Sequence, residues 1–251
     1  MEQRIYISHL LSDNEMREVI AQTNAGVECI DFSISENLDS LNANIESYRE
    51  RLKSIGTKRL IIHGPFLDLN PMSFDSEIVR VTKLRFDQAY EAARELGADK
   101  IVYHTCFNPT VYFLTGWAER TAEFYREFLE DKHDVETVIE NLYDEQWEPI
   151  KEVITRVDNE KLRVCFDIGH AHCNSSLTEH EWVENLKEFI THVHLHDNFG
   201  EKDSHLCLGE GTAAWENLLK SFSDSEDVTY TIECNTKSDV LKSYERIQKY
   251  F

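Results

Sequence analysis

The chain alternates between short runs of β-branched or aromatic residues and longer charged stretches whose apolar residues recur at helical spacing. The short runs are RIYIS (4–8), VECIDF (27–32), RLIIH (59–63), KIVYH (100–104), ETVIEN (136–141), RVCFD (163–167), THVHLH (191–196) and VTYTIE (228–233). One helical stripe runs from Phe86 to Leu96 and stops at Gly97, the residue type that ends many helices. The pattern therefore predicts eight strands that alternate with helices.

Eight strand–helix units in 251 residues match the usual size of a closed (β/α)₈ barrel. A doubly wound open sheet is the alternative, but it normally has a glycine-rich turn after its first strand, and this chain has none there. No linker, low-complexity tract or block of charge divides the sequence. We therefore expect an α/β protein in which residues 1–251 form a single TIM barrel domain.

Barrel enzymes place their chemistry at the carboxyl ends of the strands, so polar residues there are the candidates. Five predicted strands end in an ionisable residue: His63, His104, Glu140, Asp167 and Glu233. The seventh strand carries His192, His194 and His196. Side chains alternate between the two faces of a strand. Because the apolar residues between these polar ones should face the surrounding helices, the imidazoles and carboxylates should converge inside the barrel.

Burying so many ionisable groups together is costly unless something compensates their charge. Divalent cations remove this cost, and a mixture of imidazole nitrogen and carboxylate oxygen suits zinc, manganese, iron or cobalt. The sequence therefore predicts a divalent-metal site. His192, the deepest of the three histidines, is expected to be a hydrogen-bonded core residue, and His196 a substrate contact or an outer partner of a ligand.

A net charge of −21 disfavours a polyanionic partner, and no run of Lys or Arg is present to grip one. Bound cations can reverse that sign locally. The six cysteines are scattered without a C-x-x-C pair, which fits a reducing compartment. The first residues lack the apolar core of a signal peptide, and no apolar run is long enough to span a bilayer. We expect a cytoplasmic protein with no membrane partner.

Several motifs lie at the strand ends: HGPF (63–66), His104, ENLYDE (140–145), CFDIGHAH (165–172), HLHDN (194–198), DSHLCLGEG (203–211) and IE (232–233). With these motifs the chain resembles the xylose-isomerase-like TIM barrels, the superfamily of apurinic endonuclease IV and the sugar-phosphate isomerases and epimerases. The resemblance runs from the first strand to the last and is densest from Glu140 onward. Its motifs identify the superfamily better than they identify a reaction.

The resemblance implies two arrangements of metal ligands. Isomerases and epimerases hold one metal with four side chains, which here would be Glu140, Asp167, His194 and Glu233. Endonuclease IV holds three zinc ions with those four and five more. All nine matching positions carry the expected residue type: His63, His104, Glu140, Asp167, His170, His194, Asp203, His205 and Glu233. The implied cofactor is Zn²⁺, as two or three ions, or Mn²⁺.

On the ligand count, the first hypothesis is hydrolysis of a phosphoester in a small phosphorylated substrate. A metal-bridging hydroxide would attack, with Glu140 and Glu233 positioning it. The alternative is a sugar or sugar-phosphate isomerase or epimerase, in which the same two glutamates form an acid–base pair on one metal. Cleavage of DNA at abasic sites is the third hypothesis.

The chain departs from endonuclease IV in the loops that would meet DNA. Residues 32–40 and 64–76 contain neither Lys nor Arg, although Phe66 is a candidate for stacking. Without phosphate contacts a nuclease loses most of its affinity for DNA. We therefore expect a small phosphorylated or sugar substrate in place of duplex DNA, with His196 and Lys202 as further candidate contacts. The oligomeric state stays open.

Overall fold

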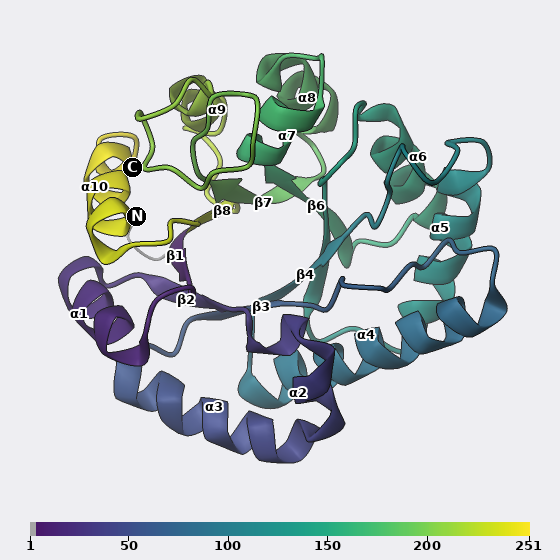
Figure 1. Cartoon of the computed structure of the whole chain (residues 1–251), viewed down its shortest axis with the longest axis horizontal. Helices are drawn as coiled ribbons and strands as arrows, with labels where there is room; N and C mark the ends of the chain where they lie inside the picture. Colours follow the sequence, from purple (N-terminus) through teal and green to yellow (C-terminus); the bar gives the residue numbers. More distant parts are fainter. Residues whose placement is uncertain (1–3) are drawn as a thin grey trace.

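The structure is a computed structural model that describes residues 4–251. Within this range eight parallel strands close into a barrel in chain order (Figure 1). The strands are β1 (Ile5–Ser8), β2 (Gly26–Cys29), β3 (Leu60–His63), β4 (Lys100–His104), β5 (Glu136–Glu140), β6 (Leu162–Asp167), β7 (Ile190–Leu195) and β8 (Thr229–Ile232). The predicted fold class is confirmed. The largest error in strand position is in β2, which ends at Cys29 because Asp31–Ser33 form a 3₁₀ turn.

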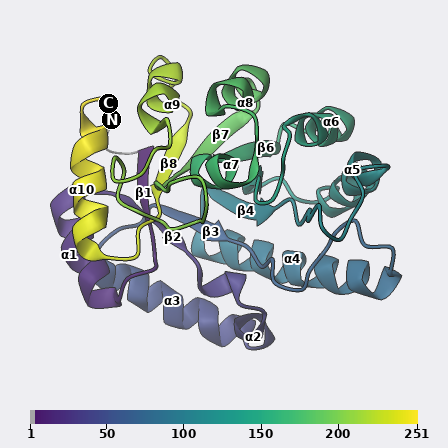
Figure 2. The same cartoon turned by 45° about the horizontal axis from the view of Figure 1, so that its top comes forward.

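Helices surround the barrel on its outside (Figures 1 and 2). They are α1 (Asp13–Thr23), α2 (Ser35–Asp39), α3 (Leu41–Ile55), α4 (Ser76–Leu96), α5 (Trp117–Phe128), α6 (Glu148–Val157), α7 (Ile168–Asn174), α8 (Glu179–Leu186), α9 (Trp215–Ser221) and α10 (Lys237–Gln248). Helix α4 shows why they end where they do. The Asp75 side chain accepts from the backbone N–H of Glu77 at its start, and Gly97 takes the left-handed conformation (φ 69°) after its last residue.

Two apolar layers follow from the alternation of side chains along the strands. The larger layer lies between the strands and the helices and includes Val193 and Leu195, as the pattern predicts. A small inner layer fills the bottom of the barrel with five side chains: Tyr6, Ile61, Val102, Val138 and Cys165. The inner positions nearer the carboxyl ends of the strands are left for polar groups.

A β-bulge at Thr191 changes the alternation in β7. Val164 of β6 pairs with Ile190, but the next residue, Cys165, pairs with His192, so Thr191 is skipped. The extra residue lets Ile190 face the outer layer while His192 faces the barrel interior. Beyond the bulge the two strands keep register, and His194 therefore lies beside Asp167.

All six cysteines are free thiols, and four of them are buried: Cys29, Cys165, Cys207 and Cys234. Among residues 4–251, no helix is both long enough and apolar enough to cross a membrane.

Candidate metal centre

The ionisable side chains gather at one rim of the barrel. They stand at or beside the carboxyl ends of β3 to β8, in this order: His63, His104, Glu140, Asp167, His194 and Glu233. In register, His104 pairs with Glu140 and Asp167 pairs with His194. Because every strand is parallel to its neighbours, all six side chains reach the same mouth of the barrel.

A first group forms around one oxygen of Glu140. The Nε2 atoms of His63 and His104 lie 3.4 and 3.2 Å from Glu140 Oε2. The same two nitrogens are 3.2 Å apart. Two imidazoles and a carboxylate in this arrangement offer three ligand atoms to one cation.

A second group forms around Nδ1 of His194. This nitrogen lies 3.4 Å from Glu140 Oε1, 3.6 Å from Asp167 Oδ2 and 3.7 Å from Glu233 Oε1. Glu140 belongs to both groups, one oxygen in each, so its carboxylate can bridge two ions. All four side chains are buried or nearly so.

A third group lies over the loop that follows β7. His170, on α7, places Nε2 3.4 Å from Asp203 Oδ2, and His205 Nε2 lies 3.0 Å from the same oxygen. An antiparallel bridge between Asp197 and Leu206 anchors this loop. The three groups thus bring together all nine of the candidate ligands named from the sequence.

Carbonyl groups fix the orientation of three of these imidazoles. Nδ1 of His63 lies 3.0 Å from the Gly64 oxygen, that of His170 2.9 Å from the Asn141 oxygen, and that of His205 3.0 Å from the Glu233 oxygen. A carbonyl oxygen only accepts, so in each ring Nδ1 carries the proton and donates it. In the neutral ring, Nε2 then presents a lone pair to the cluster, which is the arrangement typical of metal-bound histidines.

Glu28 is a buried member of the centre that the sequence analysis missed. One of its oxygens lies 3.1 Å from His194 Nε2, and the other lies 3.2 Å from His192 Nε2 and accepts from the Thr231 hydroxyl. His194 therefore turns Nδ1 toward the three carboxylates. The sequence contains a sign of this role, because Glu28 is a charged residue between Val27 and Cys29 in the middle of a strand. His192 is the hydrogen-bonded core residue that we expected.

The charges of the centre compensate one another in the absence of a cation. Burial alone would raise the pKa of the Glu140 carboxyl, but the imidazoles of His104 and His194 outweigh it and hold the pKa well below its usual range. Burial alone would lower the pKa of His205, but the carboxylate of Asp203 raises it to about 9. The pKa values of His170, His194 and His205 are raised, so protons on these three imidazoles balance part of the buried negative charge.

The fit of a metal is tested by the buried atoms that lack a hydrogen bond. Within the described part of the chain, Glu140 Oε2 and His194 Nδ1 are buried and have no hydrogen-bond partner. The first atom belongs to the first group and the second atom to the second group. Unpaired buried polar atoms are rare in folded proteins and call for an explanation such as an unseen ion. Divalent cations at these two groups would satisfy both atoms, so the residues fit the predicted metal centre.

A cavity of about 310 Å³ opens above the cluster. Seven of the candidate ligands line it, together with Ser8, Ser33, Leu142 and Tyr143. No Lys or Arg is among the described residues that line it. A ligand here meets the metal centre, hydroxyl groups and apolar surface, but no fixed cationic side chain.

The three predicted substrate contacts have different positions. Phe66 lines the cavity and stacks on His104, with ring centroids 4.3 Å apart. His196 is fully buried; its Nε2 lies 3.1 Å from both oxygens of Asp167, and its ring stacks under His205. This corrects the expectation of a substrate contact, because His205 covers the ring, and it favours the outer-partner alternative. Lys202 is exposed in the loop and does not line the cavity.

Comparisons with known proteins agree with this architecture. Residues 21–250 match the protein family described as "Xylose isomerase-like TIM barrel". An uncharacterized protein of Methanocaldococcus jannaschii is 28% identical over 231 residues, which cover 86% of this chain and 78% of that protein. A probable endonuclease 4 of Staphylococcus epidermidis is 24% identical over 205 residues, covering 73% of this chain and 67% of that protein.

A similar solved structure is the crystal structure of a D-tagatose 3-epimerase-like protein. It superposes with a TM-score of 0.81 and 25% sequence identity, and the match covers 99% of this chain and 97% of the other. The chain is thus similar both to proteins named for sugar epimerisation and to proteins named for DNA cleavage.

Proposed function

Because the chain belongs to the xylose isomerase-like TIM barrel family, we propose that it is a divalent-metal-dependent isomerase or epimerase of a small, uncharged sugar. The observation that carries the proposal is the position of the Glu140 and Glu233 carboxylates. They flank His194 Nδ1 at 3.4 and 3.7 Å, at the floor of a cavity that no described Lys or Arg lines. Similarity to a D-tagatose 3-epimerase-like protein supports the same class of reaction.

This proposal puts sugar isomerisation or epimerisation, which was the alternative in the sequence analysis, ahead of phosphoester hydrolysis. The ligand count alone favoured hydrolysis. Two later observations change that order. The solved structure with a TM-score of 0.81 is named for an epimerase-like protein, and the cavity offers no described guanidinium or ammonium group to a phosphate. An uncharged polyhydroxy compound needs no such group.

Glu140, Asp167, His194 and Glu233 would hold the divalent ion, and their mixture of nitrogen and oxygen suits zinc or manganese. When bound, such an ion supplies a Lewis acid that polarises the substrate carbonyl and acidifies the neighbouring C–H bond. The glutamates then do the proton transfer. One carboxylate takes the proton from the carbon beside the carbonyl, and the other, after drawing a proton from solvent, returns one. The number of electrons in the substrate does not change.

The test is proton exchange with solvent. The protein, loaded with Zn²⁺ or Mn²⁺, is incubated in D₂O with unphosphorylated five- and six-carbon aldoses and ketoses, and NMR follows deuterium at the carbon beside the carbonyl. We expect exchange with at least one sugar, and a loss of roughly 100-fold or more in Glu233→Gln, because a general acid–base group contributes about that much. Glu201→Gln, at an exposed position of the loop after β7, is the matched control. Absence of exchange with every sugar would refute the proposal.

Phosphoester hydrolysis is a second candidate, and one observation favours it. Proton transfer on a sugar needs four ligands, whereas five further matching side chains stand around them: His63, His104, His170, Asp203 and His205. Several adjacent ions suit the activation of water and the stabilisation of a leaving oxygen.

The double variant Asp203→Ala/His205→Ala separates the two reactions. If the protein is an isomerase or epimerase, deuterium exchange should survive this change within a few-fold. If it is a hydrolase, the wild type should cleave bis(4-nitrophenyl) phosphate, and the double variant should not. Metal analysis of the wild type adds a second readout, because one ion per chain fits proton transfer and two or three fit hydrolysis.

A further inference from the structure

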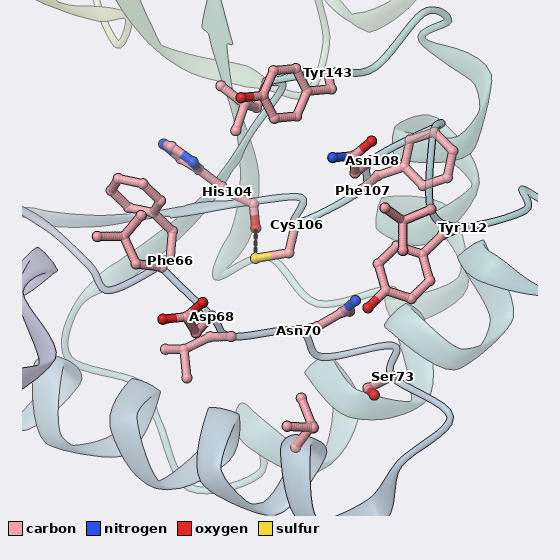
Figure 3. A pocket seen from close by; sticks show the side chains of 15 residues that line it. Phe66, Asp68, Asn70, Ser73, His104, Cys106, Phe107, Asn108, Tyr112 and Tyr143 are labelled. Carbon is pink, nitrogen blue, oxygen red and sulfur yellow. Dashed lines mark hydrogen bonds between the residues drawn. The ribbon is translucent and has the colours of Figure 1, made fainter.

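A second cavity adjoins the metal centre and has no part in the proton transfer (Figure 3). It encloses about 480 Å³ between the segments that follow β3 and β4. It shares four lining residues with the cavity over the metal centre: Phe66, His104, Leu142 and Tyr143. We call this second cavity the side pocket. The same four residues border both spaces, so the side pocket lies directly beside the cavity over the metal centre.

Five of the residues that line the side pocket carry aromatic rings: Phe66, His104, Phe107, Tyr112 and Tyr143. In Figure 3, Phe66 and His104 lie on one side, and Phe107 and Tyr112 on the other. Phe66 is held in place from behind, because its ring is nearly parallel to that of His104 (25°) and meets His63 edge-on, with centroids 5.6 Å apart. Rings fixed in this way present flat apolar faces, on which another aromatic group can stack.

The mouth of the side pocket exposes apolar side chains to water. Leu67 is 56% exposed, Val111 64% and Tyr143 45%, and all three line the pocket. Apolar surface that is rimmed by polar groups often marks a binding site. A ligand that covers these side chains gains the free energy of removing them from water.

The charge of the side pocket limits what it can accept. Asp68 carries the only carboxylate among its described lining residues, and none of these residues is Lys or Arg. A phosphate or carboxylate group would therefore find no Lys or Arg to neutralise its charge.

We propose that the side pocket binds an uncharged aromatic group attached to the sugar, so that the substrate is an aryl-substituted sugar that keeps a carbonyl group, such as an aromatic glycoside of a keto-sugar. The inference rests on the proposed function for the sugar part, which would occupy the cavity over the metal centre. A free pentose or hexose would leave the side pocket unfilled, although its 480 Å³ lies within the usual range for a ligand pocket.

Matched pairs of probes test the proposal without any need for turnover. Calorimetry on the metal-loaded protein compares phenyl and methyl β-glycosides of D-glucose, D-galactose and D-mannose. For at least one sugar, the phenyl glycoside should bind at least tenfold more tightly than the methyl glycoside. Ile78→Trp fills the pocket from α4, a rigid element, and should reduce that ratio below threefold. Leu67→Trp fills it from the loop and should do the same.

Arg80→Trp provides the control, because it adds the same indole to an exposed position of α4 outside the pocket and should leave the ratio unchanged. Equal binding of both members in all three pairs overturns the inference, as does a phenyl preference that persists in both filled variants. These results are independent of deuterium exchange. If the protein prefers phenyl glycosides but exchanges no proton, the result supports the inference about the side pocket and refutes the proposed reaction.

Discussion

At the scale of single residues, Glu28 controls the orientation of His194. It lies under that ring at the bottom of the centre and contacts no part of the cavity. Carboxylates that hold a metal-bound histidine from behind raise its basicity and fix its ring. Glu28→Gln keeps the size of the side chain but removes the charge. We expect it to weaken binding of Zn²⁺ by roughly 10- to 100-fold, which competition with a fluorescent chelator measures.

The control for Glu28 is Glu36→Gln, because Glu36 is exposed on α2 and should leave the affinity unchanged. A Glu28→Gln protein that folds normally and binds zinc with wild-type affinity would show that Glu28 has no positioning role.

Asp144 gives a pH-dependent prediction. Its carboxylate accepts from the Thr105 hydroxyl (2.6 Å) and the Leu142 backbone N–H (3.0 Å), but burial raises its pKa from 3.8 to about 6. A carboxyl with a raised pKa costs stability when it ionises in the folded state, so this cost is absent near pH 4 and complete above about pH 6. The wild type should therefore lose about 2 kcal/mol of unfolding free energy between pH 4 and pH 7 that Asp144→Asn does not lose.

Urea unfolding at the two pH values measures this difference for Asp144. Asp224→Asn, at an exposed position, should show no such difference. A difference between Asp144→Asn and the wild type that stays constant with pH would contradict the prediction.

Single residues also show where sequence reasoning succeeds and fails. The nine candidate ligands could be selected because each stands at a strand end or in a recognisable motif. Glu28 was missed because the candidates were chosen at the carboxyl ends of the strands, and Glu28 lies within a predicted strand. For His196 the choice between a substrate contact and an outer partner of a ligand stayed open, because strand alternation gives the face on which a side chain lies but not what covers it. His205, which stacks on it, comes from a loop whose path the sequence does not reveal.

At the scale of elements, the start of α7 leaves no space for a side chain. A Cβ atom on Gly169 would lie 2.0 Å from Cε1 of His196. Because His196 is buried against Asp167, it cannot move away without disturbing that ligand. We expect Gly169→Ala to lower the unfolding free energy by about 1–3 kcal/mol, the usual cost of overpacking, and also to weaken zinc binding.

Gly56→Ala is the comparison for Gly169. Gly56 has open space around it but a φ of 99°, so alanine there should cost about 1 kcal/mol in stability and leave zinc affinity unchanged. Equal effects of the two substitutions on zinc affinity would contradict the special role of Gly169.

The bulge in β7 shows what periodicity cannot predict. A strict alternation from Ile190 onward would place Ile190 and His192 on the same face. The skipped Thr191 separates them, and the histidines meet Asp167 in register. The side pocket escaped prediction for a related reason, since loops after β3 and β4 build it and their course depends on tertiary contacts.

At the scale of the whole molecule, metal binding should stabilise the fold. The candidate ligands come from five strands, the residue after a sixth, one helix and one loop, so the unfolded chain cannot present them together. A ligand that binds only the folded state at 100 times its Kd adds about 2.7 kcal/mol to the unfolding free energy. For a chain of this size we expect Zn²⁺ to raise the Tm by about 5–10 °C. Calorimetry before and after addition of EDTA checks this, and an unchanged Tm would contradict it.

The fold itself was accessible from the sequence because eight strand-and-helix units of regular length leave few arrangements. The closed barrel of residues 4–251 matches that expectation. We propose that the whole chain is one domain, since its first and last strands, β1 and β8, pair with each other. Separate folding units would give two unfolding transitions in calorimetry.

Phe66 lines both the side pocket and the cavity over the metal centre, and its ring stacks on His104. A guest in the side pocket that moves Phe66 would also change the surroundings of the imidazole behind it. Thermodynamic reciprocity then requires that such a guest change the affinity for an ion by the same factor as the ion changes the affinity for the guest. Binding in one cavity would then alter binding in the other through a single pair of stacked rings.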